Sequence, residues 1–393
     1  MPDVSTPDCE EALSDRPVRG RPAWFDLAPE PPRGTDSIDV MPAATDVVVV
    51  GLGASGLEAI VALAAGGADV LGVDAIGIAG GAAGGNGGFL LAGLADFHHH
   101  AVTRHGRDVV ARWTSKTLEE LDRLFDTEPT ARRVGSLRIA ADAAEEDDCH
   151  AQVIAMQADG LTAEPWDGPE GRGLLLASDG VFNPVARCRR LAAVARDNGA
   201  TLVAPARVGA IASGHVTVSD PTAAAAAVGD RVVRCRTVIV AVDGGLDVLL
   251  PNLRGRVRTA RLQMLATAPE TAVSLSRPVY RRHGYDYVQQ LPTGEVLLGG
   301  GRDVEGHAAW DAVPVPSAAV QDHLDALLRN TIGATAPVTH RWAARAGFTS
   351  DSLPIDAEVE PGVHVIGGYS GHGNVIGGLL ARRLAAQLLD RPR

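Results

Sequence analysis

Lysine is almost missing from this sequence of 393 residues, although basic residues as a class are not. Of the 36 basic residues only Lys116 is a lysine, and all the others are arginines. A Schiff base, a pyridoxal linkage or a lysine-activated oxygen site is therefore excluded unless Lys116 provides it. A bias towards GC-rich codons accounts for the skew, but the chemical exclusion holds whatever its origin.

Cysteines and long apolar runs are also scarce. The N-terminal residues are acidic and lack the apolar core of a signal peptide. The longest apolar region, residues 45–93, is rich in glycine and interrupted by acidic residues, so it is not typical of a membrane span. We expect a cytoplasmic protein with no membrane contact. The four cysteines form no C-x-x-C pair, which argues against a disulfide framework and a cysteine metal site: Cys9, Cys149, Cys188 and Cys235.

A surplus of positive charge is missing too. The formal net charge is −12, whereas a nucleic-acid-binding protein needs a basic face to offset phosphate charge. The apolar fraction of 46% argues against disorder, and the 45 glycines follow no G-x-y period, which excludes collagen. A chain of this length is expected to form about two or three domains.

The Pro-rich residues 1–43 form an extended lead-in, in which Trp24 either anchors the segment onto the body or belongs to a loose tail.

A nucleotide-binding pattern begins at residue 46. The run Asp46–Val50 predicts a buried parallel strand, an Ala-rich helix follows to about residue 66, and a strand over Ala68–Val73 ends at Asp74. The turn between strand and helix reads G-x-G-x-x-G: the first glycine permits a tight turn, the second admits a pyrophosphate, and the third lets helix and strand pack closely. The alternative is a helix–strand pair without ligand. The predicted dinucleotide contacts are Gly51, Gly53, Ala54, Ser55, Gly56, Asp74 on the ribose, and Ala75.

Two further Gly-rich segments favour FAD over NAD. Residues 79–93 hold seven glycines, which suits backbone wrapped around a large flat ligand better than a helix, a strand or a linker. FAD extends past the pyrophosphate, whereas a nicotinamide cofactor needs no second loop there. Near the C-terminus a strand over 362–366 leads through loop 367–374 into a helix over 375–389, whose N-terminus would stabilise negative charge on a reduced flavin. The predicted contacts are Ala83, Gly84, Asn86, Gly87, Gly88, Phe89, Gly368, Tyr369, Gly371, His372, Gly373, Asn374 and Val375.

The intervening sequence adds strands. Thr237–Val242 predicts a buried strand before a tight turn at residues 243–245, and strands over Thr201–Val208 and His215–Val218 follow a helix over Cys188–Asn198. Residues 277–301 alternate around a turn at 292–294, which indicates an antiparallel sheet. The further predicted cofactor contacts are Val208, Ala241 and Gly244.

Taken together, the motifs resemble those of D-amino-acid-oxidase-like FAD-dependent oxidoreductases, nearest the γ-glutamylputrescine oxidase and glycine oxidase branch. They are DVVVVGLGASG, GNGGFLLAG, the run 180–184, TVIVAVDGG, the segment 349–354 and GGYSGHGN, and they span about residues 22–390. The resemblance implies an α/β fold, with an FAD-binding Rossmann-like domain of the glutathione reductase type and a discontinuous α+β substrate domain on an antiparallel sheet. It implies a lead-in (1–43), an FAD-binding domain (44–110, 175–250 and 343–393) and a substrate domain (111–174 and 251–342).

The resemblance also implies the chemistry. Family members transfer a hydride from the C–N carbon of an amine or amino acid to flavin N5, and molecular oxygen then yields hydrogen peroxide. Some relatives tether FAD through Cys or His, but residues 345–348 contain no Cys and Asn86 stands where the His would be, so we expect non-covalent FAD. Gly85 replaces an arginine that is common in the family, which puts one cofactor contact in doubt.

Four residues are candidates for the catalytic site. Tyr287 matches a carboxylate-binding tyrosine of glycine-oxidase-like relatives, with Tyr285 as a second candidate, and His372 would contact the flavin. Arg345 is one residue away from Ala346, which stands at the relatives' carboxylate-binding arginine, and one residue changes the face of a strand. If no arginine faces the flavin, an amine without an α-carboxylate is the better expected substrate.

Other polar residues have structural interpretations. We expect Arg302 to pair with Asp303 or Asp286, Trp342 to lie in the core or wall the pocket, and the acidic run 145–148 to be solvated. The histidines 98–100 form a surface cluster at a helix start, one of which could line the active-site entrance; consecutive residues do not converge on one ion, so no metal site is predicted.

Two other functions stay open beside the oxidase. One is an FAD dehydrogenase or tailoring enzyme of secondary metabolism with little oxygen reactivity, which the scarcity of lysine favours weakly. The other is a non-catalytic flavin-binding subunit. The assembly is expected to be a monomer or a small homo-oligomer.

Overall fold

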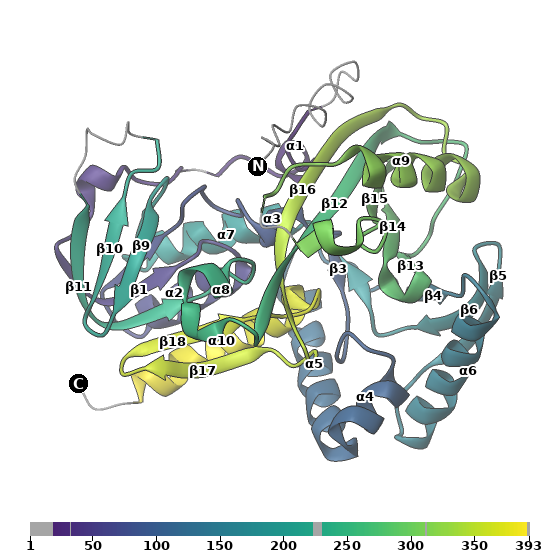
Figure 1. The fold of residues 1–393 in the computed structure, drawn as a ribbon, viewed down its shortest axis with the longest axis horizontal. Coiled ribbons are helices and arrows are strands. Elements are labelled where there is room, and N and C mark those ends of the chain that lie inside the picture. The colour runs from purple at the N-terminus through teal and green to yellow at the C-terminus, as the bar shows by residue number, and fades with distance from the viewer. Residues whose placement is uncertain (1–18, 32, 223–229, 311–312, 391–393) are drawn as a thin grey trace, which may run out of the picture.

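The computed structural model describes residues 19–31, 33–222, 230–310 and 313–390, so Cys9 and the first part of the lead-in lie outside the described residues. Two eight-stranded sheets stand beside each other, and helices pack around them (Figure 1). This arrangement confirms the predicted α/β class with a second, largely antiparallel sheet. The division into an FAD-binding and a substrate domain stays a prediction.

The first sheet carries the predicted nucleotide-binding strands at its centre. Strand β1 (Ala44–Val50) pairs in parallel with β2 (Val70–Val73) and with β11 (Arg231–Val240), and helix α2 (Ala54–Ala65) connects β1 to β2. The strand order is β17-β18-β11-β1-β2-β8, and β9 and β10 form a hairpin on β11. The other strands are β8 (Thr201–Val203), β9 (Arg207–Ala212), β10 (His215–Ser219), β17 (Ile355–Glu360) and β18 (Val363–Gly367).

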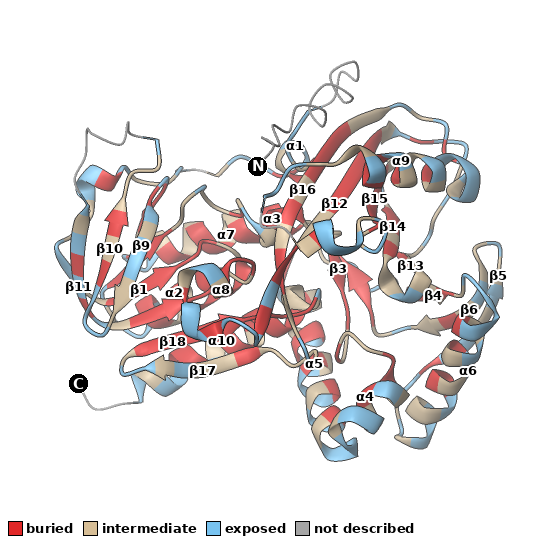
Figure 2. Cartoon of the chain, in the orientation of Figure 1, coloured by how far each residue is buried: buried red, intermediate tan, exposed pale blue. Residues whose placement is uncertain are grey.

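Both faces of this sheet are covered, which explains the unbroken valine run of β1. On one face Val47 and Val49 pack in a core with α2, α7 (Pro184–Asp197) and α10 (Gly373–Leu389). On the other, Val48 and Val50 pack with β9, β10 and α8 (Leu246–Leu249). The strands β1 and β18 are accordingly coloured as largely buried in Figure 2. A strand enclosed in this way needs β-branched residues at successive positions rather than alternation.

The second sheet has the order β16-β12-β15-β14-β13-β4-β6-β5. Its neighbours run antiparallel except β13 and β4, and β14 and β15 form the hairpin predicted around residues 292–294. Strand β16 runs on towards β17, so it links the two sheets (Figure 1). The strands are β4 (Ser136–Ile139), β5 (Glu164–Gly168), β6 (Gly171–Leu176), β12 (Val257–Pro269), β13 (Val279–Arg281), β14 (Asp286–Gln290), β15 (Glu295–Gly300) and β16 (Val338–Thr349).

Shorter elements complete the fold, including a small sheet of β3 (Phe89–Leu90) and β7 (Gly180–Val181). The remaining α-helices are α1 (Trp24–Leu27), α3 (Ala82–Gly85), α4 (His98–His105), α5 (Arg107–Thr127), α6 (Ala143–Ala158) and α9 (Ala318–Ala326). The 3-10 and π segments are η2 (Ile38–Val40), η3 (Pro251–Leu253), η4 (Arg282–Gly284), η5 (Gly306–Trp310) and η6 (Leu327–Ile332). Within the described ranges, none of these helices has the length and apolar composition to cross a bilayer.

Several predicted boundaries shift. The single strand expected over 201–208 is wrong: it divides into β8 and β9 around Pro205, which cannot donate to a strand ladder. Helix α7 begins at Pro184 instead of Cys188 because the side chain of Asn183 accepts hydrogen bonds from the N–H groups of Val185 and Ala186. Helix α10 begins two residues earlier than expected, at Gly373.

Candidate functional site

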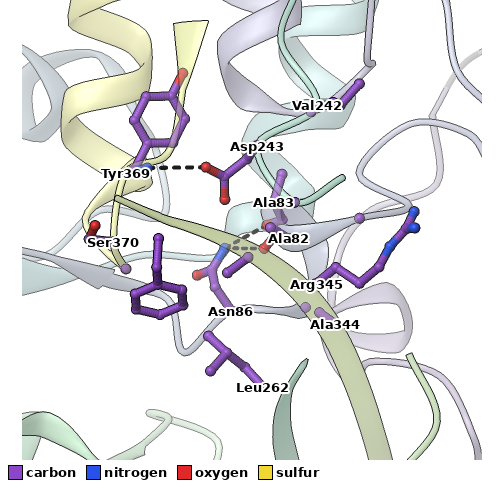
Figure 3. A pocket seen from close by; sticks show the side chains of 18 of the residues that line it. Ala82, Ala83, Asn86, Val242, Asp243, Leu262, Ala344, Arg345, Tyr369 and Ser370 are labelled. Atoms are coloured by element: carbon purple, nitrogen blue, oxygen red, sulfur yellow. Dashed lines mark hydrogen bonds between the residues drawn. The ribbon is translucent and has the colours of Figure 1, made fainter. Parts of the chain in front are cut away.

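A cavity of about 820 Å³ lies where the two sheets meet. Its wall combines residues of all three Gly-rich segments with residues of the second sheet, and Figure 3 shows some of them. The volume lies in the range of ligand pockets, roughly 300–1,000 Å³. Segments that are far apart in the sequence therefore converge on one site, as predicted for cofactor-binding loops.

The first Gly-rich turn forms one part of the cavity. Gly51 has a φ of +111°, and a side chain there would come within 2.7 Å of the carbonyl oxygen of Ala241. Gly53, Ala54 and Ser55 line the cavity, and α2 begins at Ala54 without a side-chain cap. Uncapped N–H groups at a helix N-terminus bind anions, so this end suits a pyrophosphate.

Asp74 lines the same end of the cavity. One carboxylate oxygen accepts a hydrogen bond from the N–H of Leu52 (2.8 Å), and the other accepts from the N–H groups of Ile76 and Gly77 (2.8 and 2.9 Å). A carboxylate offers about four acceptor positions, so capacity for a ribose hydroxyl remains. Asp74 therefore holds the loop that follows β2, and its ribose contact stays a prediction.

The second Gly-rich segment is fixed by two tryptophans. The indole N–H of Trp24 donates to the carbonyl of Asn86 (2.8 Å), and that of Trp342 donates to the carbonyl of Gly85 (2.9 Å). Both indoles are buried in the core that contains α2. Trp24 is thus the anchor of the lead-in, not part of a loose tail, and Trp342 is a core residue outside the lining of the cavity.

The second and third Gly-rich segments are joined to each other. The amide of Asn374 donates to the side-chain oxygen of Asn86 and to the carbonyl of Phe89, both at 2.9 Å. Asn86 also donates to the carbonyls of Ala82 and Ala83, as drawn in Figure 3. Two amide side chains therefore set the distance between the loops that frame the cavity.

A half-buried aspartate that the sequence analysis did not single out organises the third segment. Asp243 accepts hydrogen bonds from the N–H groups of Gly347 (3.0 Å), Gly368 (2.9 Å) and Tyr369 (3.2 Å). Burial raises its pKa, and these three backbone bonds oppose that rise. Asp243 thus connects the turn after β11 to both β16 and the loop before α10, and Figure 3 shows it facing Tyr369. The pair of glycines after it was the only sequence signal.

His372 lies where the cavity meets a second, smaller one of about 210 Å³. Both cavities are lined by Leu91, Asp96, Arg138, Tyr280 and His372. Burial, reinforced by the charge of Arg138, lowers the pKa of His372 to about 4 against the opposing effect of its bond to the Gly93 backbone. Its Nδ1 is buried without a partner among the described residues. His372 is therefore neutral at physiological pH.

This pKa predicts a loss of stability in acid. Because the folded-state pKa lies below the ordinary value of about 6.5, neutral His372 contributes stability that is present above pH 6.5 and is lost as the pH falls towards 4. Between pH 7.5 and 4.5 the loss is about 2–3 kcal/mol. In denaturant unfolding, the free energy of unfolding of His372→Asn should therefore decline less over this pH interval than that of the wild type. His215→Asn, at an exposed position of β10, should decline like the wild type, and an equal decline in all three proteins would refute the assignment.

Not every predicted cofactor contact lines the cavity. Four glycines do not: a side chain on Gly56 would overlap the carbonyl of Gly51, and one on Gly84 that of Ala79. Gly88 and Gly368 have positive φ and close neighbours in Phe182 and Thr349, respectively. These four glycines allow close packing of the loops against the rest of the protein, and they do not face the cavity. The other predicted contacts line the cavity: Gly51, Gly53, Ala54, Ser55, Asp74, Ala75, Ala83, Asn86, Gly87, Phe89, Val208, Ala241, Gly244, Tyr369, Gly371, His372, Gly373, Asn374 and Val375.

The candidate catalytic residues also line the cavity. The ring of Tyr287 lies between Gly87 and Gly299, where side chains would collide with it, and meets Phe89 edge-on at 6.0 Å. Burial raises its pKa, so the phenol stays protonated. Tyr285 lines the cavity beside Arg302. Arg345 packs against Gly244 and Gly245, and in Figure 3 its side chain extends away from Tyr369 and Ser370.

Two expectations about polar residues were wrong. Arg302 pairs with neither Asp286 nor Asp303, because Arg282 binds both carboxylates. The acidic run 145–148 is not simply solvated: Glu145 is buried and accepts hydrogen bonds from the N–H groups of Arg282 (3.1 Å) and His283 (2.5 Å), two residues with positive φ. Glu145 thus fixes a turn whose His283 lines the cavity.

The histidine cluster also departs from expectation. Helix α4 does begin at His98, but His98 is buried and contacts Asp159 at 2.8 Å. Nε2 atoms of His99 and His100 each lie 3.2 Å from the same carboxylate oxygen of Asp148, so consecutive histidines do converge here. The reason is that α6 brings Asp148 over the first turn of α4, a contact between residues far apart in the sequence. None of the three histidines lines the main cavity.

The second sheet and its loops contribute further lining residues that the sequence analysis did not place there, among them Arg138, Leu262, Tyr280, His283 and Arg302. They share no motif and come from β4, β12, β13, η4 and the loop after β15. Among the described cysteines, Cys149, Cys188 and Cys235 are buried and none lines the cavity. That FAD is bound without a covalent tether stays a prediction.

The sequence matches a family model described as FAD dependent oxidoreductase (DAO) over residues 46–387. A curated relative, the probable oxidoreductase OrdL of Rhizobium meliloti (strain 1021), is 26% identical over 418 residues, covering 95% of this chain and 90% of the relative. The structure of glycine oxidase from Geobacillus kaustophilus has a TM-score of 0.69 at 17% identity and covers 90% of this chain and 96% of that one. L-proline dehydrogenase from P. horikoshii also has a TM-score of 0.69, at 15% identity, with coverages of 88% and 94%.

The residues present fit FAD. The matched region contains all three Gly-rich segments of the cavity, the uncapped N-terminus of α2 suits the pyrophosphate, and the close approach at Gly51 leaves no room for a side chain. The segment around Asn86 and the N-terminus of α10 would hold the ribityl chain and the ring. The chain therefore belongs to the DAO family of FAD-dependent oxidoreductases.

Proposed function

We propose that this protein is an oxidase that acts on the C–N bond of an amine or amino acid. The observation that carries this proposal is the cavity of about 820 Å³, in which the three Gly-rich segments, the third of which contains His372, meet Tyr287 of the second sheet. Two proteins of similar fold, glycine oxidase and L-proline dehydrogenase, are named for amino-acid substrates, which supports a C–N substrate here.

The expected reaction balances as a two-electron oxidation. When bound, FAD would supply the hydride acceptor at N5, and molecular oxygen would take up the two electrons and two protons to give hydrogen peroxide. The substrate loses a hydride from carbon and a proton from nitrogen and becomes an imine. Water then hydrolyses the imine to a carbonyl compound and ammonia or an amine.

The chain itself has to position the substrate and keep it in the reactive protonation state. Oxidation proceeds from the neutral amine, although an amine enters the cavity largely as the ammonium ion. Because His372 is neutral, it adds no positive charge that would repel this ammonium ion. The half-buried phenol of Tyr287 stays protonated and offers a hydrogen-bond donor on the side of the second sheet. The uncapped N-terminus of α10 adds a fixed positive dipole, which favours negative charge on the cofactor.

A dehydrogenase with little oxygen reactivity is the second candidate. Its support is that the single lysine of the sequence, Lys116, lies exposed on α5 and does not line the cavity. An oxygen site that depends on a lysine is therefore not supported by the lining of this cavity.

Aerobic turnover distinguishes the two. The holoprotein is incubated with a panel of amines and amino acids, and peroxide, ammonia and the reduction of an artificial dye are measured. The oxidase should form one peroxide per imine, and Lys116→Arg should form peroxide at the wild-type rate because the residue is remote from the cavity. Dye reduction with little peroxide would favour the dehydrogenase. Absence of any reduction would leave a flavin-binding subunit.

A further inference from the structure

Arg302 is a cation in the cavity wall that has no carboxylate partner among the described residues. It follows β15, and its guanidinium carbon lies 4.6 Å from the ring centroid of Phe348, 5.0 Å from that of Tyr285 and 5.1 Å from that of Trp310. We call these four residues the Arg302 cluster. Three aromatic rings thus hold one charged group at the cavity.

The nearby acidic groups are occupied by other residues. Asp286 contacts Arg282 and His323, each at 3.0 Å, and Asp303 also pairs with Arg282. Aromatic rings attract a guanidinium group and restrict its position, but they do not use its N–H donors. The donors of Arg302 are therefore available to an anion that enters the cavity.

The Arg302 cluster lies on the face of strand β16 that lines the cavity. Ala346 and Phe348 both line the cavity and are two residues apart on β16, so their side chains share a face of the strand. Ala346 stands where related sequences carry an arginine, and an alanine supplies no charge. Arg302 approaches the same face from β15, because its guanidinium group stacks on Phe348.

Three other arginines line the wall, and they are placed differently. Arg207 is exposed at the start of β9. Arg138 donates to the side chain of Gln152 (3.2 Å) and lies over the ring of Phe97 (4.2 Å). Arg345 packs against Gly244 and Gly245, in the turn after β11. Of these four arginines, Arg302 is the one that combines an aromatic setting with donors that no described residue accepts.

We propose that the Arg302 cluster binds the carboxylate of the substrate, so that the substrates are amino acids and not simple amines. This inference rests on the proposed function and replaces the expectation that a missing arginine at position 346 favours an amine without a carboxylate. The guanidinium fork binds both oxygens of a carboxylate, and the rings keep it from rotating away.

The test compares Arg302→Met with Arg258→Met. Arg258 stacks on the same Trp310 at 4.2 Å but is exposed and does not line the cavity, so it is a matched control for loss of an arginine on that ring. Each holoprotein is mixed without oxygen with an amino acid or with its decarboxylated amine, and flavin reduction is followed. Arg302→Met should weaken the apparent affinity for the amino acid about 10- to 100-fold and that for the amine less than about threefold. Arg258→Met should leave both unchanged, and Arg302→Lys should restore part of the affinity for the amino acid.

A second readout separates this inference from the proposed function. Acetate is titrated at constant ionic strength, and the shift of the visible flavin spectrum reports binding without turnover. Wild type and Arg258→Met should bind acetate, whereas Arg302→Met should not. If amino acids reduce the flavin of Arg302→Met with wild-type affinity, or if amines are the better substrates of the wild type, the inference is wrong while the oxidase stands. If acetate binding depends on Arg302 but no C–N compound reduces the flavin, the anion site stands and the proposed function fails.

Discussion

Gly56→Ala is expected to yield a protein that contains almost no FAD. A methyl group at this position would overlap the carbonyl oxygen of Gly51 and lie 3.4 Å from the side chain of Val49. The main obstacle is backbone, which cannot rotate away as a side chain can. Helix α2 would have to separate from β1, and its N-terminus would leave the position where it meets the pyrophosphate. The overpacking should also destabilise the fold by about 1–3 kcal/mol.

The measurement is the ratio of FAD to protein in purified samples, together with the free energy of unfolding. Gly34→Ala is the control, since a side chain at Gly34 meets nothing within 4 Å and this residue does not line the cavity. Gly34→Ala should retain a full complement of FAD. Gly56→Ala with one FAD per chain would contradict the assigned role of the first Gly-rich turn.

Arg187→Met is expected to lower the free energy of unfolding by about 3–5 kcal/mol. Arg187 is fully buried on α7, and it donates to Glu58 of α2 (2.8 Å) and to the carbonyl of Asn374 (2.7 Å) in α10. It thus joins the three helices that cover one face of the first sheet. Methionine fills a similar volume but leaves a buried carboxylate and a buried carbonyl without this partner.

The same network predicts a dependence on pH. Burial raises the pKa of Glu58, but the charges of Arg187, Arg123 and Arg382 outweigh burial and lower the pKa to about 2. Because the folded-state pKa is depressed, Glu58 contributes stability that is present above its unfolded value near 4.5 and is lost as the pH falls towards 2. The difference between wild type and Arg187→Met should therefore shrink over this interval.

Urea unfolding between pH 7 and 3 checks both statements. Arg133→Met is the control, because Arg133 and its partner Asp122 form an exposed ion pair at 2.5 Å and such pairs contribute less than about 1 kcal/mol. If both substitutions lowered the free energy of unfolding equally, the buried Arg187 would contribute no more to stability than the exposed Arg133, and the prediction would be wrong.

The parts of the site that depend on local sequence were predictable. The turn at Gly51, the acid at the end of β2 and the helix that starts after loop 367–372 each depend on neighbouring residues, and each lies at the cavity. The hairpin around residues 292–294 is local in the same sense. In such cases backbone conformation and hydrophobic pattern select one structure over a few residues.

The parts that depend on distant partners were not predictable. The expected partners of Arg302, Asp286 and Asp303, pair with Arg282 instead. The aromatic neighbours of Arg302 include Trp310 from η5 and Phe348 from β16. Asp148 lies almost 50 positions after the histidines that it joins. No pattern within one strand or helix specifies such contacts, because they depend on how α4, α6 and the strands of the second sheet pack.

Anaerobic titration of the purified holoprotein with C–N compounds tests whether the protein oxidises them with its flavin. The visible absorbance of oxidised flavin is followed while amino acids and amines are added in the absence of oxygen. We expect at least one amino acid to remove this absorbance fully at one equivalent per flavin, and the admission of oxygen to restore it with release of peroxide. A flavin that stays oxidised with every amino acid and amine, while dithionite reduces it, would contradict the proposed oxidase function.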